Sequence, residues 1–410
     1  MERFDTLIIG GGPAGLIAAI RATSLGQKTA VIEKNPSVGE KLLLAGRGRC
    51  NFTNAEDDIN TFISRYGDNG KFLYSAFSKF GPRETMTFFA NIGVEMLEER
   101  GKRIFPKEGG GQKVLDRLLL QCKKGQVRIL RNTPVKALKV RNGHVEYIIT
   151  GSDELSAGKY IIATGGKSYP RTGSTGDGYT FAQSAGHTIT PLYPALVPVK
   201  TAETWPKLAS GCNLRNVRLH VLLDGQEVDS RFGEMEFTNF GVSGPIVMDI
   251  SSHIPDWKGE VVFSLDMKPS LTNEILTERV KREIAGLEGH GRFVRLLRKL
   301  VPAGMVSLML ELSDIPHDKP VEYISDEEIA ELVALLKDIR MTVNGLWSFN
   351  NAVVTRGGVS LKEIDPATMK SKLCDNLYFA GEVLDLNGPS GGFNLQMCWS
   401  TGYIAGSVNE

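Results

Sequence analysis

The sequence predicts an α/β protein: a Rossmann-type domain that is interrupted by a small β domain and a helical insert. The first observation is "DTLIIGGGPAGLIAAI" at residues 5–20, where four glycines within six positions separate two apolar runs. The second is "KTAVIE" at residues 28–33, an apolar run that ends on an acid. The third is a central region in which alternating segments and then helical periodicity replace the α/β order.

The glycines lie where a predicted buried strand, residues 4–9, passes into a predicted helix that ends at Gly26. In the pattern G-x-G-x-x-G, Gly10 permits the tight turn and Gly12 lets the backbone approach a pyrophosphate. Gly15 lets the helix pack against the strand, and the helix N-terminus offers N–H groups to the anion. A glycine-rich turn that binds no ligand is the alternative.

Glu33 is a second feature that favours dinucleotide binding at this turn. It ends the second apolar strand, 18 residues after Gly15, where a carboxylate can accept hydrogen bonds from a ribose diol. Strand, glycine pattern, helix, strand and acid therefore agree on dinucleotide binding. An acid at this place favours a free ribose 2′-hydroxyl over a 2′-phosphate.

The stretch after Glu33, "EKNPSVGEKLLLAGRGRCNFTNAE", is irregular, whereas an NAD enzyme would continue with regular βα units. Such a loop fits the longer FAD molecule, and Lys41, Arg49 and Asn51 are available for phosphate charge and for polar atoms of the ring. A plain surface loop is the alternative. Cys50 lies beside this predicted flavin loop, where a packed thiol is a commoner role than a nucleophile.

The chain end contains a second candidate segment. "DNLYFAGEVLDL" reads as a strand that ends at Gly381 and Glu382, and "GPSGGFNLQMCWSTGYIAG" reads as a glycine turn followed by a helix. Glu382 can accept a hydrogen bond from the ribityl chain. The helix beginning near Gly392, Phe393 and Asn394 can direct its N–H groups toward the pyrimidine side of a flavin. A purely structural turn and helix is the alternative.

The predicted domains are residues 1–190 and 359–410 for the cofactor domain, 191–270 and 342–358 for the β domain, and 271–341 for the helical insert. Turns are expected at Asn142-Gly143 and Asp224-Gly225. A capping box of Ser325 with Glu328 predicts a helix start in the insert. The segment "GLWSFNNAVVTRGGVSL" after the insert reads as rich in strands.

Composition excludes several classes of protein. The formal net charge of +1 offers no overall attraction to nucleic acid or to anionic lipid. Five scattered cysteines, the closest pair 24 positions apart, indicate reduced thiols and exclude a flavin disulfide reductase, which needs two neighbouring cysteines. The six histidines form no metal spacing, and no apolar stretch approaches about 18 residues. We expect a cytoplasmic protein without metal, membrane or nucleic-acid partner.

Together, "GGGPAGLIAA", "KLLLAGRGRCNFTN", "ATGGKSYPRTGSTGDGYTFAQSAGH", "FTNFGVSGP" and the long segment from "TRGGVSLKEID" to "STGYIAG" resemble the aminoacetone-oxidase-like FAD-binding family (BaiN/YhiN type). That family is related to the glutathione-reductase and fumarate-reductase flavoproteins. The resemblance implies noncovalent FAD in a GR2-like Rossmann domain interrupted by a β-barrel and a helical insert. Two positions depart from the family pattern. Arg47 stands where a small residue is common, and Asn239 where a histidine is usual, so no role of that histidine is carried over.

The same resemblance implies that the backbone of Val135 meets the adenine and that "ATGG" passes close to the cofactor. A plain hairpin and strand end is the alternative for these residues. The candidate cofactor-binding residues are Gly10, Gly12, Pro13, Ala14, Gly15, Glu33, Lys34, Lys41, Arg49, Cys50, Asn51, Val135, Thr164, Gly165, Gly166, Gly381, Glu382, Gly392, Phe393 and Asn394.

These observations favour an FAD-dependent oxidoreductase that acts on a small organic molecule, an amine or an enone as the family's names suggest. No second strand, G-x-G-x-x-G and helix unit occurs, so NAD(P)H would have to reach an open face of the flavin as a transient reductant. An RNA-modifying flavoprotein and a redox-silent flavin-binding scaffold are the alternatives. No residue is assigned as a catalytic acid or base.

Overall fold

The computed structural model describes residues 2–151, 153–287 and 291–407. Residues 1, 152, 288–290 and 408–410, which belong to the predicted domain ranges, lie outside the described residues. The chain divides into two compact units, one made of residues 1–194 and 352–410 and the other of residues 195–351. We retain the domain bounds given by the sequence as a proposal.

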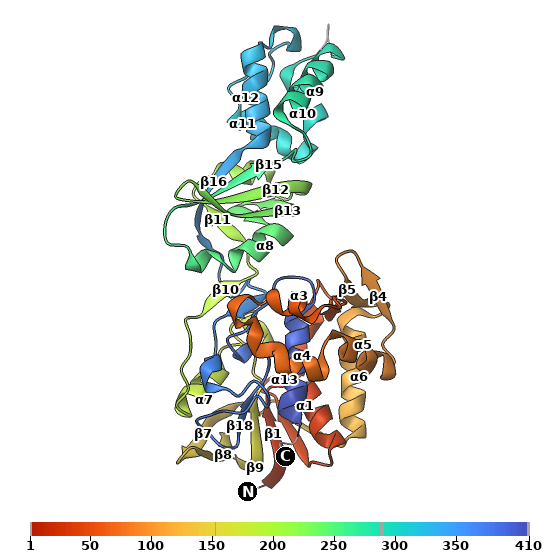
Figure 1. Cartoon of the computed structure of the whole chain (residues 1–410), viewed down its shortest axis with the longest axis vertical. Coiled ribbons are helices and arrows are strands. Elements are labelled where there is room, and N and C mark those ends of the chain that lie inside the picture. The colour runs from red at the N-terminus through yellow and green to blue at the C-terminus, as the bar shows by residue number, and fades with distance from the viewer. Residues whose placement is uncertain (1, 152, 288–290, 408–410) are drawn as a thin grey trace. The chain divides into compact units, whose positions relative to one another are not determined.

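The first unit contains a seven-stranded sheet in the order β6-β2-β1-β9-β8-β7, with β18 paired to β9 (Figure 1). The strands β1, β2, β6, β9 and β18 run parallel, whereas β7 and β8 are antiparallel. Their bounds are β1 Glu2–Ile9, β2 Thr29–Ile32, β6 Arg128–Leu130, β7 Val135–Arg141, β8 His144–Thr150, β9 Asp153–Ile162 and β18 Leu377–Phe379.

The register brings the carboxyl ends of four parallel strands to one edge of this sheet. Ile9 pairs with Ile32 on one side and with Ile162 on the other, and Ile162 pairs in turn with Phe379. Ligands of open parallel sheets bind outside the carboxyl ends of the strands. The loops that follow β1, β2, β9 and β18 are therefore the place to look for the site.

Helices cover this sheet, and α1 and α13 lie side by side in Figure 1. Their contact depends on small residues, because a Cβ at Gly402 would lie 2.3 Å from Ala14 O and one at Gly406 would lie 2.4 Å from Ala18 O. The helices of this unit are α1 Pro13–Ser24, α2 Glu40–Leu44, α3 Ile59–Ser64, α4 Tyr74–Phe80, α5 Pro82–Asn91, α6 Gly110–Lys124, α7 Asp177–Ser184 and α13 Phe393–Gly406. A small sheet β3-β5-β4 adds Thr53–Asn54, Arg103–Pro106 and Met96–Glu99.

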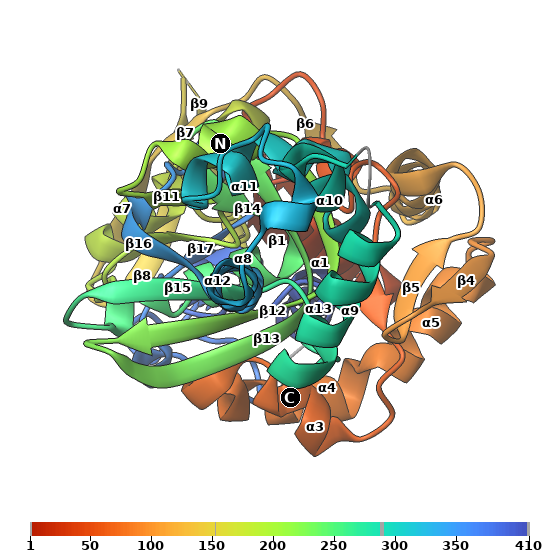
Figure 2. The same ribbon diagram turned by 90° about the horizontal axis from the view of Figure 1, so that it is seen from above.

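The second unit is a closed barrel in the order β11-β14-β13-β12-β15-β16, with the insert helices between its last two strands. Figure 2 shows β12 and β13 side by side with β15. The strands are β11 Val199–Thr201, β12 Asn213–Leu223, β13 Gln226–Thr238, β14 Gly241–Ser243, β15 Val261–Asp266 and β16 Ile339–Leu346. The helices are α8 Pro245–Ser251, α9 Asn273–Ala285, α10 Phe293–Leu300, α11 Val306–Leu312 and α12 Asp326–Lys337.

The fold class predicted from the sequence is confirmed: a Rossmann-type domain, a β-barrel and a helical insert. The segment after the insert has fewer strand residues than its pattern indicates. Gly345 and Leu346 end β16, and three further residues form β17, Val354–Arg356, which pairs with β10, Tyr193–Ala195. Among the described residues, no helix is both long and apolar enough to cross a membrane.

Candidate cofactor site

The turn between β1 and α1 uses its three fingerprint glycines in different ways. Gly10 has a φ of +112°, and a Cβ there would lie 2.4 Å from Ala163 O. A Cβ at Gly15 would lie 1.9 Å from Gly10 O, so both positions are closed to larger residues by the fold itself. A Cβ at Gly12 would meet nothing within 4 Å. Gly12 is the N-cap of α1, so the space beside the helix N-terminus is open.

Glu33 is fixed beside this turn by two main-chain donors. Gly11 N donates to its Oε2 and Asn35 N donates to its Oε1, each over 2.9 Å. A carboxylate oxygen has two acceptor sites, so each oxygen can still accept a further hydrogen bond. The arrangement suits a ribose diol that lies over the glycine turn.

Lys34 points toward the start of α7 instead. Its Nζ donates to Asp177 Oδ2 over 2.7 Å and to Thr175 Oγ1 over 2.5 Å. Burial opposes ionisation of Asp177, but the hydrogen bonds from Lys34 and Thr175 outweigh it and lower the pKa of this carboxyl. Lys34 therefore serves an ion pair in this structure.

Lys41 and Glu382 form a largely buried cluster with two residues that the sequence does not point to, Ser168 and Thr355. Glu382 Oε2 accepts from Lys41 Nζ over 2.6 Å, and Glu382 Oε1 accepts from Ser168 Oγ and from Thr355 N, each over 2.7 Å. Lys41 Nζ also donates to Ser168 Oγ over 2.5 Å. Nothing in the local sequence marks Ser168 or Thr355, because their role arises only when distant segments meet.

The loop of Arg49, Cys50 and Asn51 contains three different environments. Arg49 is exposed, forms an ion pair with Glu99 and lies over the Phe105 ring at 4.3 Å from its centroid. Cys50 is fully buried, and burial raises the pKa of its thiol to about 12. Asn51 Oδ1 is buried and has no hydrogen-bond partner in the part of the chain that the structure describes.

The N-terminus of α13 lies against this loop. Gly392, its N-cap, has a φ of +100°, and a Cβ there would lie 2.3 Å from Thr53 O and 2.9 Å from Asn51 Oδ1. The first N–H groups of a helix have no partner within the helix. The side chain of Asn394 instead holds the preceding turn, because it donates to Gly388 O and accepts from Gly388 N. The main-chain N–H groups in the first turn of α13 are therefore available to a ligand.

The remaining candidates are placed by the sheet edge and by packing. Gly381, with a φ of +77°, donates its N–H to Thr401 Oγ1 over 2.9 Å, and a Cβ there would lie 2.8 Å from Ala14 Cβ. The main chain of Val135 at the start of β7 pairs with Thr150. Pro13 is the first residue of α1, Thr164, Gly165 and Gly166 follow β9, and Phe393 packs its ring 4.8 Å from that of Phe62.

The structure therefore brings Gly381 beside Ala14, Lys41 beside Glu382, and Asn51 beside Gly392, all in the first unit. It directs Lys34 and Arg49 to ion pairs and buries the Cys50 thiol. Among the described residues, no group of three or more His, Cys, Asp or Glu side chains could hold a metal ion.

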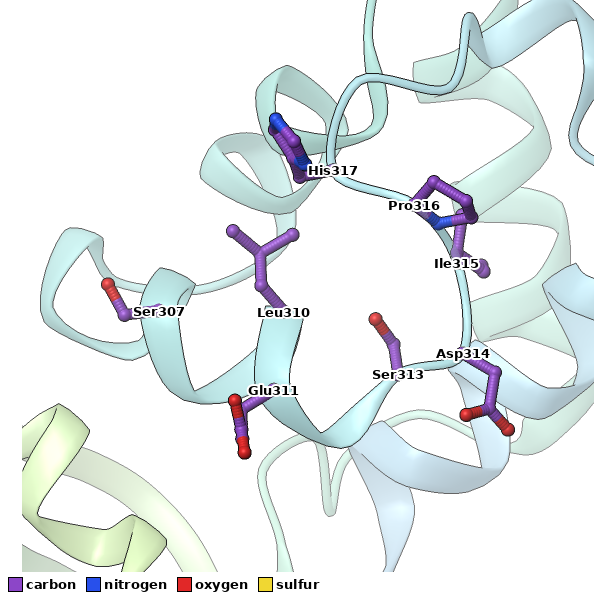
Figure 3. A pocket seen from close by; sticks show the side chains of 8 residues that line it. All are labelled: Ser307, Leu310, Glu311, Ser313, Asp314, Ile315, Pro316 and His317. Carbon is purple, nitrogen blue, oxygen red and sulfur yellow. The ribbon is translucent and has the colours of Figure 1, made fainter.

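A separate surface pocket lies in the second unit, where the chain from Ser313 to His317 leaves α11 (Figure 3). Figure 3 shows Leu310 and Ser313 lining it, with His317 at the far end of the segment. Every candidate cofactor residue belongs to the other unit, so this pocket is no part of the site described above.

Comparison with known proteins gives three findings. The model of the family described as "HI0933-like protein Rossmann domain" matches residues 4–408. The "3-dehydro-bile acid delta(4,6)-reductase" of Clostridium scindens is 33% identical over 405 residues, 97% of each chain. The "Ribosomal RNA dihydrouridine synthase" of Haemophilus influenzae is 31% identical over 402 residues, 97% of this chain and 96% of that protein.

Among solved structures, the open conformation of a flavocytochrome c3 fumarate reductase matches with a TM-score of 0.55. The match covers 99% of this chain and 78% of that one, at 17% sequence identity. At this level of identity the likeness shows the fold.

Proposed function

The chain belongs to the family of the HI0933-like protein Rossmann domain, and we propose that it is a reductase that saturates a carbon–carbon double bond conjugated to a carbonyl group. It is an FAD-dependent oxidoreductase. The proposal adds the type of bond, a small cyclic substrate, NAD(P)H as transient electron donor and a cytoplasmic location.

The residues present fit FAD. The open space at Gly12 beside the α1 N-terminus suits a pyrophosphate, and Glu33 retains acceptor sites for a ribose. Glu382 accepts three protein hydrogen bonds and keeps a site for a ribityl hydroxyl. The buried, unpaired Asn51 Oδ1 next to the α13 N-terminus suits a polar ring edge. When bound, FAD supplies hydride transfer between donor and substrate.

The observation that carries the type of bond is the similarity to two proteins whose names describe one kind of reduction. The identity is 33% and 31%, over nearly the full chain in each case. A 3-oxo steroid with double bonds at positions 4 and 6 is a conjugated dienone, in which the bond at position 4 and the carbonyl group form an enone. Uridine becomes dihydrouridine when its C5=C6 bond, conjugated to the C4 carbonyl, is saturated. Saturating the double bond next to the carbonyl group needs, in either substrate, a hydride at the β-carbon and a proton at the α-carbon.

The substrate class is proposed from size and charge. The net charge of +1 gives the chain no overall attraction to a polyanion. Residues 195–351 contain 17 Lys and Arg against 23 Asp and Glu, so this unit is acidic by sequence. A small enone therefore fits the chain better than RNA.

Ribosomal RNA is the second candidate substrate, favoured by the 31% identity to the dihydrouridine synthase over nearly the full chain. Because residues 195–351 are acidic, the basic residues for RNA would come from the other unit, which has 31 Lys and Arg against 24 Asp and Glu. Binding to RNA should then fall steeply as salt is raised.

The experiment is stopped-flow reduction of the FAD-loaded protein by NADH and by NADPH, followed by reoxidation with a steroid 4-en-3-one or with a ribosomal RNA transcript. The proposal expects bleaching by one nicotinamide and rapid reoxidation by the enone. Reoxidation by RNA alone would replace the small substrate with the second candidate. If neither nicotinamide reduces the flavin, or if neither acceptor reoxidises it, the proposal is overturned.

A further inference from the structure

The amide oxygen of Asn51 is a buried acceptor without a partner. In the described residues no protein group donates to it, although the atom is shielded from solvent. Buried polar atoms in native proteins nearly always have a hydrogen-bond partner, so such an atom points to a ligand group that binds there. The partner has to be a donor, since an amide oxygen can only accept.

The atoms around Asn51 Oδ1 narrow the chemistry of that partner. The oxygen lies 2.9 Å from where a Cβ of Gly392 would be, at the N-cap of the fourteen-residue helix α13. The first turn of α13 offers main-chain N–H donors without helical partners. A ligand edge that fits both features carries a donor next to an acceptor.

A phosphate offers acceptors only, so it cannot satisfy Asn51 Oδ1. The oxidised flavin ring carries a single N–H, at N3, and it is flanked by the carbonyl groups at C2 and C4. We propose that Asn51 Oδ1 accepts the N3–H of the flavin while the first turn of α13 donates to an adjacent ring carbonyl. This inference rests on the proposed function, and it makes Asn51 the residue that positions the ring.

The segment that holds Asn51 is fixed against α13. Trp399 Nε1 donates to Phe52 O over 2.9 Å, and Thr53 Oγ1 donates to Gln396 Oε1 over 2.5 Å. Both partners of these bonds are buried. The acceptor is therefore held in place before the ligand arrives, which reduces the ordering cost of binding.

The test compares FAD with N3-methyl-FAD, in which the donor is replaced by a methyl group, by titration of flavin-free protein and flavin fluorescence. We expect the natural sequence to prefer FAD by about tenfold or more, equivalent to about 1.4 kcal/mol. Asn51→Ala should bind FAD about tenfold more weakly and distinguish the two flavins by less than about twofold. Asn51→Asp keeps the acceptor and should keep the preference.

Asn54→Ala is the matched control. Asn54 lies three residues away, but its Nδ2 already donates to Gly101 O and Gly391 O. Its loss should leave the preference for FAD over N3-methyl-FAD unchanged. If Asn51→Ala does not fold, Asn51→Leu, which resembles the amide in size and lacks the acceptor, takes its place.

If Asn51→Ala prefers FAD over N3-methyl-FAD as strongly as the natural sequence does, the inference is overturned while FAD binding stands. Failure of the natural sequence to bind FAD would overturn the proposed function and this inference with it. A uracil base has the same donor and acceptor edge as the flavin, so the titration contains no substrate. Weaker binding of FAD by Asn51→Ala in this titration then shows that Asn51 contacts the flavin.

Discussion

Lys41 Nζ lies 2.6 Å from Glu382 Oε2, although 341 positions separate the two residues in the chain. Their side chains are 21% and 11% exposed, so the pair is shielded from most of the solvent. It joins α2 to the turn that follows β18. Replacing one member leaves the other charge without its partner in a largely buried place.

Lys41→Met should therefore lower the free energy of unfolding of the flavin-free protein by about 1–3 kcal/mol, the range for a lost hydrogen bond to a charged group. Urea unfolding followed by circular dichroism measures this change. Lys34→Met is the control, because the Lys34–Asp177 pair is more exposed, at 26% and 41%, and should cost less than about 1 kcal/mol. Equal losses in the two variants would contradict the shielded role of Lys41.

Gly12→Val should separate cofactor binding from folding. A Cβ at Gly12 meets no protein atom within 4 Å and the φ of −80° suits any L-residue, so the unfolding temperature should stay within a few degrees. The side chain would fill the space proposed for the pyrophosphate and remove about 90% or more of the bound flavin, a cost above about 1.4 kcal/mol. The ratio of flavin to protein absorbance measures it.

Gly15→Ala is the contrasting variant for this experiment. Its Cβ would lie 1.9 Å from Gly10 O, so the helix has to move, at a cost of about 1–3 kcal/mol in folding. A Gly12→Val protein that retains its full flavin content would place the pyrophosphate elsewhere.

Features that depend on neighbouring residues could be predicted from the sequence. The Asn142-Gly143 and Asp224-Gly225 turns are confirmed, since all four residues have positive φ and connect antiparallel strands. The capping box is confirmed as well, because Ser325 Oγ accepts from Glu328 N. These signals are local: a φ value, a cap or a spacing suffices to define them.

Contacts between distant segments could not be predicted in the same way. The ion pair of Arg49 with Glu99 and the bond of Ser168 to Glu382 each need the register of several strands before the side chains meet. The small sheet of β3, β5 and β4 also lacks a strong periodic signal, since β3 has two residues and the others four. Residue type and motif therefore predict the candidate residues, whereas their partners depend on the three-dimensional fold.

Cys50 should be chemically silent. Because burial raises the pKa of its thiol to about 12, only about one molecule in ten thousand carries the thiolate at pH 8. Iodoacetamide labelling of the native protein, read by mass spectrometry, should modify the half-buried Cys212 before Cys50. Cys50→Ala should keep its flavin content. If iodoacetamide labels Cys50 faster than Cys212, Cys50 is again a candidate nucleophile.

His187 should make stability depend on pH. Its Nδ1 lies 3.1 Å from Glu363 Oε2 and its Nε2 lies 2.7 Å from Ser371 Oγ. Burial lowers the pKa of His187 below 6.5 and outweighs the Glu363 carboxylate, which raises it. As the pH falls, the imidazole of His187 therefore binds a proton in the unfolded chain before it does so in the folded chain.

The stability that His187 contributes is complete above about pH 6.5 and is lost as the pH falls through the lower pKa of the folded state. The pKa of Glu363 is also lowered, from 4.5, so its own contribution is lost only in more acidic solution. Urea unfolding at pH 7.5 and 5.5 should therefore show a smaller drop for His187→Gln than for the natural sequence. A drop in His187→Gln as large as that of the natural sequence would assign the pH dependence to other groups.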